Sequence, residues 1–126
     1  MKTKLKANGP VIIPPVKFRG RPITEFRRDS EFPGGIPQWF RFLNKTFRYP
    51  DSAVVYEIQG TVVIGFMVSK DGKVHDLRIV QSVNKYLDEE ALRVMGQTPD
   101  WQPAIVGGII SDSYKRQPID FKLQSE

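Results

Sequence analysis

Cysteine is absent from this 126-residue sequence, and histidine occurs once, as His75. Without cysteine the chain has no disulfide, no thiolate nucleophile and no cysteine-based metal site. A single histidine excludes a histidine-based metal cluster, and a Ser-His-Asp arrangement would have to use that one residue. His75 stands next to Asp76 in a predicted hairpin, where a solvated strand residue is the favoured interpretation.

Sequence motifs of the common enzyme classes are missing as well. The chain contains no G-x-S-x-G, H-E-x-x-H, P-loop or dinucleotide fingerprint. The acidic triplet Asp88-Glu89-Glu90 does not form a catalytic pair, because consecutive residues on a helix do not face one another. Helix capping and solvation account for the triplet. We therefore predict a binding module that uses no cofactor and no metal, and not an enzyme.

Long apolar runs are also lacking, since no segment approaches the roughly 20 apolar residues that span a bilayer. The first six residues carry the positive charge of a signal-peptide start, but prolines at positions 10, 14 and 15 interrupt the chain before an apolar core develops. We expect any segment that anchors or exports the protein to lie outside this sequence.

Positive charge is concentrated at one end of the chain. The net charge is +5, and residues 1–31 hold eight Lys/Arg against three Asp/Glu, whereas the remaining 95 residues hold eleven of each sign. A basic arm of this kind could contact anionic lipid or nucleic acid, but a solvated segment is the favoured interpretation. Nucleic-acid binding is accordingly not expected.

Proline and glycine divide the chain into two parts. Residues 1–35 hold five of the ten prolines and four glycines, which favours extended conformations over a helix or a central strand. We interpret residues 1–31 as a basic, proline-containing arm and residues 32–126 as the folded domain. The apolar groups of the arm are more than a free linker needs, so parts of it are expected to lie on the domain surface.

Helical periodicity occurs in three places in the domain. After the turn at Gly34-Gly35, four apolar residues recur at helical spacing and predict a core-facing stripe: Trp39, Phe40, Leu43 and Phe47. Tyr49-Pro50 ends this helix, since the residue before proline is pushed out of the α region. A short helical turn is predicted over 51–57 and a longer helix over 86–96, closed by Gly96.

Alternation of apolar and polar residues predicts the strands. Residues 61–69 place Val62, Ile64, Phe66 and Val68 on one face. Asp71-Gly72 then predicts a hairpin to a return strand over 74–82, with a bulge near His75-Asp76. The last strand is predicted over 109–124, and Pro118 favours an edge position because proline cannot donate to a ladder. The result is an α+β domain: a three-stranded antiparallel sheet with helices packed on one face.

An ordered series of residues resembles the TonB C-terminal domain family over residues 32–123. The opening Phe32-Pro33-Gly34-Gly35 is similar to Bacteroidetes-type members. The residues that carry the resemblance are Tyr49-Pro50, Ala53, Gly60-Thr61-Val62, Phe66-Met67-Val68, Asp71-Gly72-Lys73-Val74, Ser82, Leu87-Asp88, Ala91-Leu92, Pro99-x-Trp101-x-Pro103, Gly107 or Gly108, and Pro118-Ile119-x-Phe121.

The resemblance implies a periplasmic domain that connects an inner-membrane energy complex with outer-membrane TonB-dependent transporters. It implies that the extended N-terminal segment of a transporter adds as a strand beside the last strand of the domain. It further implies an inner-membrane anchor in the full-length protein. Carried over to this sequence, the implied peptide-binding residues are Arg48, Tyr49, Pro50, Ile109, Ile110, Ser111, Asp112, Ser113, Tyr114, Ile119 and Phe121.

Two departures from the family pattern leave an alternative open. The chain shows a short proline-containing arm in place of an anchor and a long spacer, and a charged stretch over 112–117 would twist or bulge the last strand. The alternative is an accessory or sensory module whose edge strand pairs with a second copy in a homodimer, without transducing energy. Both alternatives use the same edge of the sheet.

Overall fold

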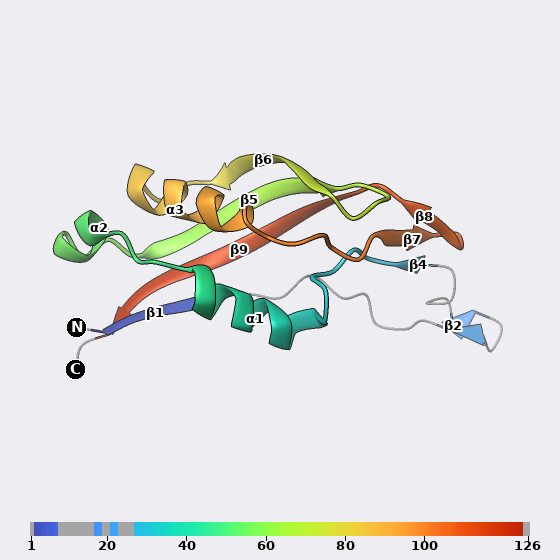
Figure 1. Ribbon diagram of the computed structural model, residues 1–126, viewed down its shortest axis with the longest axis horizontal. Coiled ribbons are helices and arrows are strands. Elements are labelled where there is room, and N and C mark those ends of the chain that lie inside the picture. The colour runs from blue at the N-terminus through green and yellow to red at the C-terminus, as the bar shows by residue number, and fades with distance from the viewer. Residues whose placement is uncertain (1, 8–16, 19–20, 23–26, 125–126) are drawn as a thin grey trace.

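The computed structural model describes residues 2–7, 17–18, 21–22 and 27–124 of the chain (Figure 1). The largest sheet has four antiparallel strands in the order β1-β9-β5-β6. Of the segment over 1–35 that was predicted to be extended, residues 1, 8–16, 19–20 and 23–26 lie outside the described residues. A separate pair is formed by β2 (Lys17–Phe18) and β3 (Arg21–Pro22).

The predicted hairpin is confirmed as β5 (Gly60–Val68) and β6 (Val74–Gln81). Its turn needs glycine at position 72, where φ is +84° and a Cβ would come 2.3 Å from the carbonyl oxygen of Trp101. The close approach is useful, because the Trp101 N–H donates to the carbonyl oxygen of Gly72 at 2.9 Å. The loop before β7 is thereby held against the hairpin.

The predicted bulge in the return strand is also confirmed. The register passes from Met67↔His75 to Gly65↔Arg78, so β6 contributes one more residue than β5 between these pairs. Asp76 lies in the extra turn of chain with φ of +56°. The bulge changes which residues of β6 share a face and brings Arg78 opposite Gly65.

The predicted last strand over 109–124 is wrong in its first part, because the chain changes sheets at Asp112. β9 (Ser113–Gln124) pairs with β5 at nine consecutive positions. β8 (Ile109–Ser111) pairs instead with β7 (Ala104–Val106), in a three-stranded sheet completed by β4 (Arg27–Arg28). The Asp112 carboxylate accepts a hydrogen bond from the Lys70 N–H at 2.9 Å, which fixes the point where the chain leaves one sheet for the other.

The predicted three-stranded sheet is present as β6-β5-β9, and β1 (Lys2–Ala7) adds a fourth strand that the sequence analysis did not predict. β1 runs antiparallel to β9, with a register from Lys2↔Gln124 to Ala7↔Ile119. The first described residue of the chain thus lies opposite the last described one (Figure 1).

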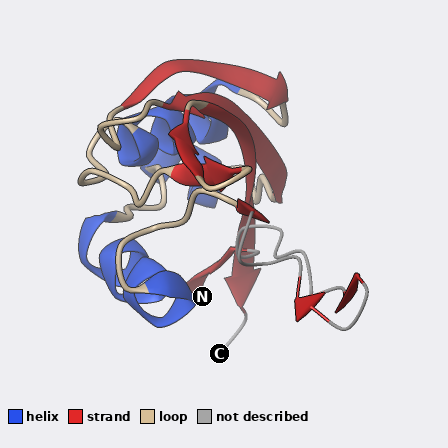
Figure 2. Ribbon diagram, turned by 90° about the vertical axis from the view of Figure 1, so that its right-hand side faces the viewer, coloured by secondary structure: helices blue, strands red, loops and turns tan. Residues whose placement is uncertain are grey.

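Helices α1 (Gly35–Thr46), α2 (Asp51–Val55) and α3 (Lys85–Met95) pack on one face of the sheet, as predicted (Figure 2). Asn84 caps α3, since its Oδ1 accepts from the Leu87 N–H at 3.1 Å. The predicted stripe of α1 needs one correction. Phe40 is 36% exposed, and Phe42 packs against the core in its place.

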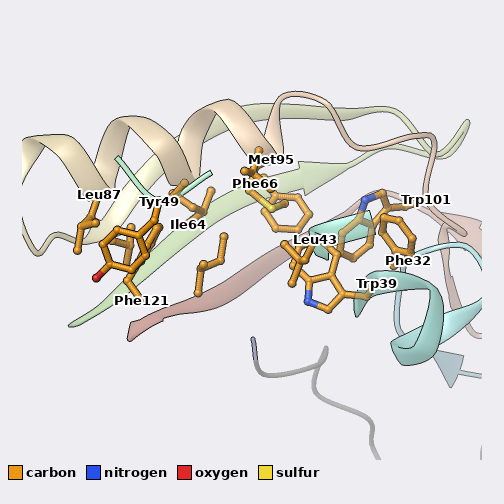
Figure 3. Close-up of a cluster of buried hydrophobic side chains, with 14 of the residues drawn as sticks. Phe32, Trp39, Leu43, Tyr49, Ile64, Phe66, Leu87, Met95, Trp101 and Phe121 are labelled. Atoms are coloured by element: carbon orange, nitrogen blue, oxygen red, sulfur yellow. The ribbon is translucent and has the colours of Figure 1, made fainter. Parts of the chain in front are cut away.

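One hydrophobic core lies between the helices and the sheet (Figure 3). At one end of it, Trp101 makes edge contacts with Phe32 and Phe66, with ring centroids 5.8 and 5.1 Å apart. At the other end, Tyr49 meets Phe121 edge-on at 5.8 Å. Aromatic pairs of this kind add about 0.5–1.5 kcal/mol to the burial of their surface. The core therefore fixes β5, and β9 around Ile119 and Phe121, to the helices.

Candidate peptide-docking edge

The residues that the sequence analysis assigned to peptide binding divide into three groups. Ser113, Tyr114, Ile119 and Phe121 lie on β9. Ile109, Ile110 and Ser111 form β8 in the other sheet, separated from β9 by Asp112. Arg48, Tyr49 and Pro50 form the corner between α1 and α2. The structure brings the corner and β9 together, and it does not align β8 with β9 in one strand.

β9 has one edge that β5 fills and a second edge that is covered over part of its length. The second edge pairs with β1 between Ile119 and Gln124. Over 113–118 no strand pairs with this edge among the described residues. Unpaired N–H and C=O groups at a sheet edge are a template for another extended chain. The part of the edge over 113–118 is therefore the position where a strand can be added directly.

Two side chains of the segment predicted as the arm, Asp29 and Ser30, fasten this same part of β9 on its helix-covered face. The Lys115 side chain is 4% exposed, and its Nζ lies 2.7 Å from Oδ2 of Asp29. The hydroxyl of Ser113 hydrogen-bonds that of Ser30, which is fully buried, at 2.8 Å. A buried ammonium needs such a partner, because removing one member of a buried ion pair leaves an uncompensated charge.

The opposite face of β9 carries an exposed cluster of one tyrosine and two arginines. The Tyr114 hydroxyl lies over Gly65, where a Cβ would come within 2.4 Å of it. The guanidinium carbons of Arg78 and Arg116 lie 5.0 and 5.8 Å from the Tyr114 ring centroid. Hydrogen bonds from Arg78 and then from Arg116 lower the pKa of the Tyr114 phenol. We call these three residues the arginine-tyrosine cluster. The sequence analysis missed it because it depends on the bulge in β6 and on the lack of a side chain at Gly65.

Tyr49 supports β9 from the core and does not present its ring to solvent. Its side chain is buried against Phe47 and Phe121, and its hydroxyl donates to the carbonyl oxygen of Ile58. Burial raises the pKa of the Tyr49 phenol. Pro50 directly precedes α2 in an extended conformation. The corner thus sets the position of Phe121 and of the part of β9 around it.

A buried carboxylate attaches this corner to α3. Oε2 of Glu90 accepts from the Arg48 N–H at 2.6 Å, and Arg93 donates to both oxygens of Glu90 at 2.6 and 2.8 Å. Arg93 also donates to the carbonyl oxygen of Thr46 at 2.7 Å. The prediction that the acidic triplet is solvated is wrong for Glu90, which is 7% exposed. The spacing of Glu90 and Arg93, three residues apart on a helix, was the signal for this pair.

The β7-β8 end presents apolar side chains to solvent. Val106, Ile109 and Ile110 are 49%, 68% and 53% exposed. The Ser111 hydroxyl donates to the carbonyl oxygen of Ile109 at 2.9 Å and so remains within its own turn. These residues form a separate exposed apolar surface, next to the Ser113 end of β9.

Two further observations concern the part of the chain that the structure describes. In those residues no helix has both the length and the apolar character needed to cross a membrane. The same residues contain no group of three or more His, Cys, Asp or Glu side chains that could hold a metal ion.

The fold and the site define a small α+β domain with a partly open sheet edge, and comparisons with known proteins identify its family. The family described as Gram-negative bacterial TonB protein C-terminal matches residues 45–123. That match covers more than half of the chain, so the protein belongs to the TonB C-terminal family, and the resemblance seen in the sequence is confirmed. It is a TonB-like, transport-associated domain.

A solved structure agrees with this assignment at the level of fold. The solution structure of the Helicobacter pylori TonB C-terminal domain is similar to this chain with a TM-score of 0.52 and 20% sequence identity. The similarity covers 75% of this chain and 89% of the other. No curated protein matches the sequence.

Proposed function

We propose that the domain captures the extended N-terminal segment of an outer-membrane TonB-dependent transporter by strand addition to β9. The observation that carries this proposal is the edge of β9 over 113–118, which has no strand partner among the described residues. Membership of the TonB C-terminal family supports a transporter as the partner. Main-chain hydrogen bonds supply the affinity in this mode of recognition, and alternate side chains supply the specificity.

The arginine-tyrosine cluster supports a preference for acidic segments. Arg78 and Arg116 have no carboxylate partner within the described part of the chain. A segment added beside β9 places every second side chain on the face that holds this cluster. An acidic residue at such a position gains a charge-assisted hydrogen bond.

In this proposal the domain works in the periplasm. An anchor outside these residues links it to the inner-membrane energy complex, and the captured segment connects it to the outer membrane. The contacts on the covered face of β9 support the proposed link between the two membranes. The ion pair between Lys115 and Asp29 holds β9 to the segment before α1, and the contact between Tyr49 and Phe121 holds it to the corner between α1 and α2. The added strand therefore binds to a fixed part of the domain.

The test is a titration of isotope-labelled protein with synthetic N-terminal segments of outer-membrane TonB-dependent transporters, followed by backbone amide shifts. The largest shifts are expected over Ser113–Phe121. A matched control peptide carries proline at every second position, which removes donors from the peptide and leaves the domain unchanged.

Three outcomes decide the proposal. Binding of the parent peptide and not of the proline peptide supports strand addition. Binding of both with equal affinity argues against it, as does the absence of shifts with any segment. Absence of shifts together with a concentration-independent dimer in sedimentation would favour the self-pairing accessory module.

A further inference from the structure

Two of the residues assigned to peptide docking, Ile119 and Phe121, already have a strand on each side. On one side β5 pairs Val62 with Ile119 and Gly60 with Phe121. On the other side β1 pairs Ala7 with Ile119 and Leu5 with Phe121. Each backbone group of a strand can join one ladder only. A partner segment that uses the edge of β9 below Pro118 therefore competes with β1 for the same N–H and C=O groups.

The sequence of β1 supports its pairing independently of the register. Residues 2–7 alternate lysine with Thr3, Leu5 and Ala7, which is the period-two pattern of an edge strand. They contain neither proline nor glycine, whereas residues 9–15 contain both. Lysine is also the residue type that protects sheet edges from further pairing. The first residues of the chain are thus suited to cover an edge without offering a new one.

β1 is the more easily displaced of the two neighbours of β9. β5 pairs with β9 at nine positions and places Val62, Ile64, Phe66 and Val68 in the core. β1 pairs with β9 at six positions, and it is the edge strand of this sheet, with a strand neighbour on one side only among the described residues. The register also puts Lys4 opposite Lys122, and like charges at directly opposite positions weaken an antiparallel pair.

We propose that β1 is a built-in cover of the docking edge, which a partner segment must displace before it can pair with β9 below Pro118. This inference rests on the proposed function, since it names the regulation of the same edge. A partner segment first pairs with the open part of the edge over 113–118. Pairing then extends along β9 toward Gln124 as β1 leaves. The apparent affinity is lowered in proportion to the fraction of molecules in which β1 is open.

The natural lack of cysteine allows a reversible lock to test this proposal. Directly opposite residues in antiparallel strands have Cα atoms about 4.5–5.5 Å apart, within the range that a disulfide spans. The double variant Lys4→Cys with Lys122→Cys is expected to form one disulfide that holds β1 on β9 when oxidised. The reduced form of the same protein is its own control, and Lys4→Cys alone controls for the oxidant.

The probe is a synthetic transporter N-terminal segment that binds the parent protein. The oxidised double variant is expected to bind it at least about tenfold more weakly than the reduced form, because the open fraction falls toward zero. A variant that lacks residues 1–7 is expected to bind it several-fold more tightly than the parent. Equal affinity in the oxidised and reduced forms would overturn the inference and leave the proposed function standing.

A second measurement needs no transporter segment. Hydrogen exchange of the β9 amides over 119–124 is expected to be slower in the parent than in the variant without residues 1–7. Adding a synthetic peptide of residues 1–8 to that variant should restore the protection. Unchanged exchange would show that β1 does not cover the edge. Protection by β1, with no transporter segment bound by any variant, would keep the cover and remove the proposed function.

Discussion

Besides their pairing with β5, the upper part of β9 (residues 113–117) and its lower part (residues 119–124) are held by different means. Over 113–117, the partners are side chains: Asp29 neutralises the buried Lys115, and Ser30 bonds Ser113. Over 119–124, the partner is the main chain of β1. Side-chain partners depend on residue identity at one position, whereas a ladder accepts any extended chain that offers donors and acceptors. The side-chain contacts over 113–117 are therefore expected to stay in place, whereas another extended chain can replace β1 over 119–124.

The largest effect is expected when the core support of the lower part is removed. Phe121→Ala should lower the free energy of unfolding by about 3–5 kcal/mol, since it leaves a cavity beside Tyr49 and Phe47. Urea denaturation followed by tryptophan fluorescence measures this. Lys122→Ala, one residue further and exposed, is the control and should change stability by less than about 0.5 kcal/mol.

The next effect concerns the side-chain contacts of the upper part. Asp29→Asn removes the charge that compensates Lys115 and should lower the free energy of unfolding by about 2–3 kcal/mol, somewhat less than for a fully buried pair because Asp29 is 33% exposed. Asp100→Asn breaks the exposed pair with Lys73 and should have an effect below about 1 kcal/mol. Equal losses in the two variants would mean that the burial of Lys115 is unimportant.

A smaller effect is expected from removing β1. The variant without residues 1–7 keeps Asp29 and Ser30, and we expect its free energy of unfolding to lie within about 1 kcal/mol of the parent. The reason is that each net hydrogen-bond gain is small and is offset by the entropy of ordering the strand. Denaturation of this variant beside Asp29→Asn compares the two parts of β9 directly. A loss as large as that of Asp29→Asn would contradict the difference between them.

The smallest effect is a difference between two tyrosines. Tyr114 should ionise below its ordinary pKa of 10.0, because Arg78 and Arg116 favour the phenolate. Tyr49 should ionise above 10.0, because burial disfavours its phenolate. A folded pKa that is raised gives stability that is present below pH about 10 and is lost as the pH rises through the folded value. NMR titration of the tyrosine rings measures both values.

Gly65→Ala is the matched variant for this titration. A Cβ at position 65 displaces the Tyr114 hydroxyl from its place between the two arginines. The lowered pKa of Tyr114 should return toward 10.0 in this variant, while that of Tyr49 stays raised. A Tyr114 pKa that does not move would show that the hydroxyl position over Gly65 is not the cause of the shift.

Local patterns predicted the elements, and contacts distant in sequence determined the rest of the site. The helices, the hairpin at Asp71-Gly72 and the bulge at Asp76 follow from spacing and turn residues within a few positions. The ion pair of Lys115 joins residues 86 positions apart, and no local signal identifies such a partner. The same holds for β1, whose alternating lysines indicate an edge strand and do not say which edge it covers.

The break at Asp112 has a different physical origin. Apolar and polar residues alternate clearly only over 119–124, and residues 109–118 contain no glycine that would mark a turn, so the pattern alone gave no boundary within 109–124. The change of sheet depends on the Gly107-Gly108 turn, which folds β8 back on β7, and on the hydrogen bond from Lys70 to Asp112. Pairing partners therefore decided the boundary, and partners are a property of the whole fold.

The opposition of Lys2 and Gln124 also has a mechanical consequence. A tension applied to the chain from the N-terminal side of Lys2 reaches the Lys2↔Gln124 pair before the other described pairs of β1 and β9. In this unzipping geometry the hydrogen-bonded pairs break one after another, so little force is needed to separate β1 from β9. The core, whose side chains must all separate together, is shielded from that load until the last pair, Ala7↔Ile119, has opened.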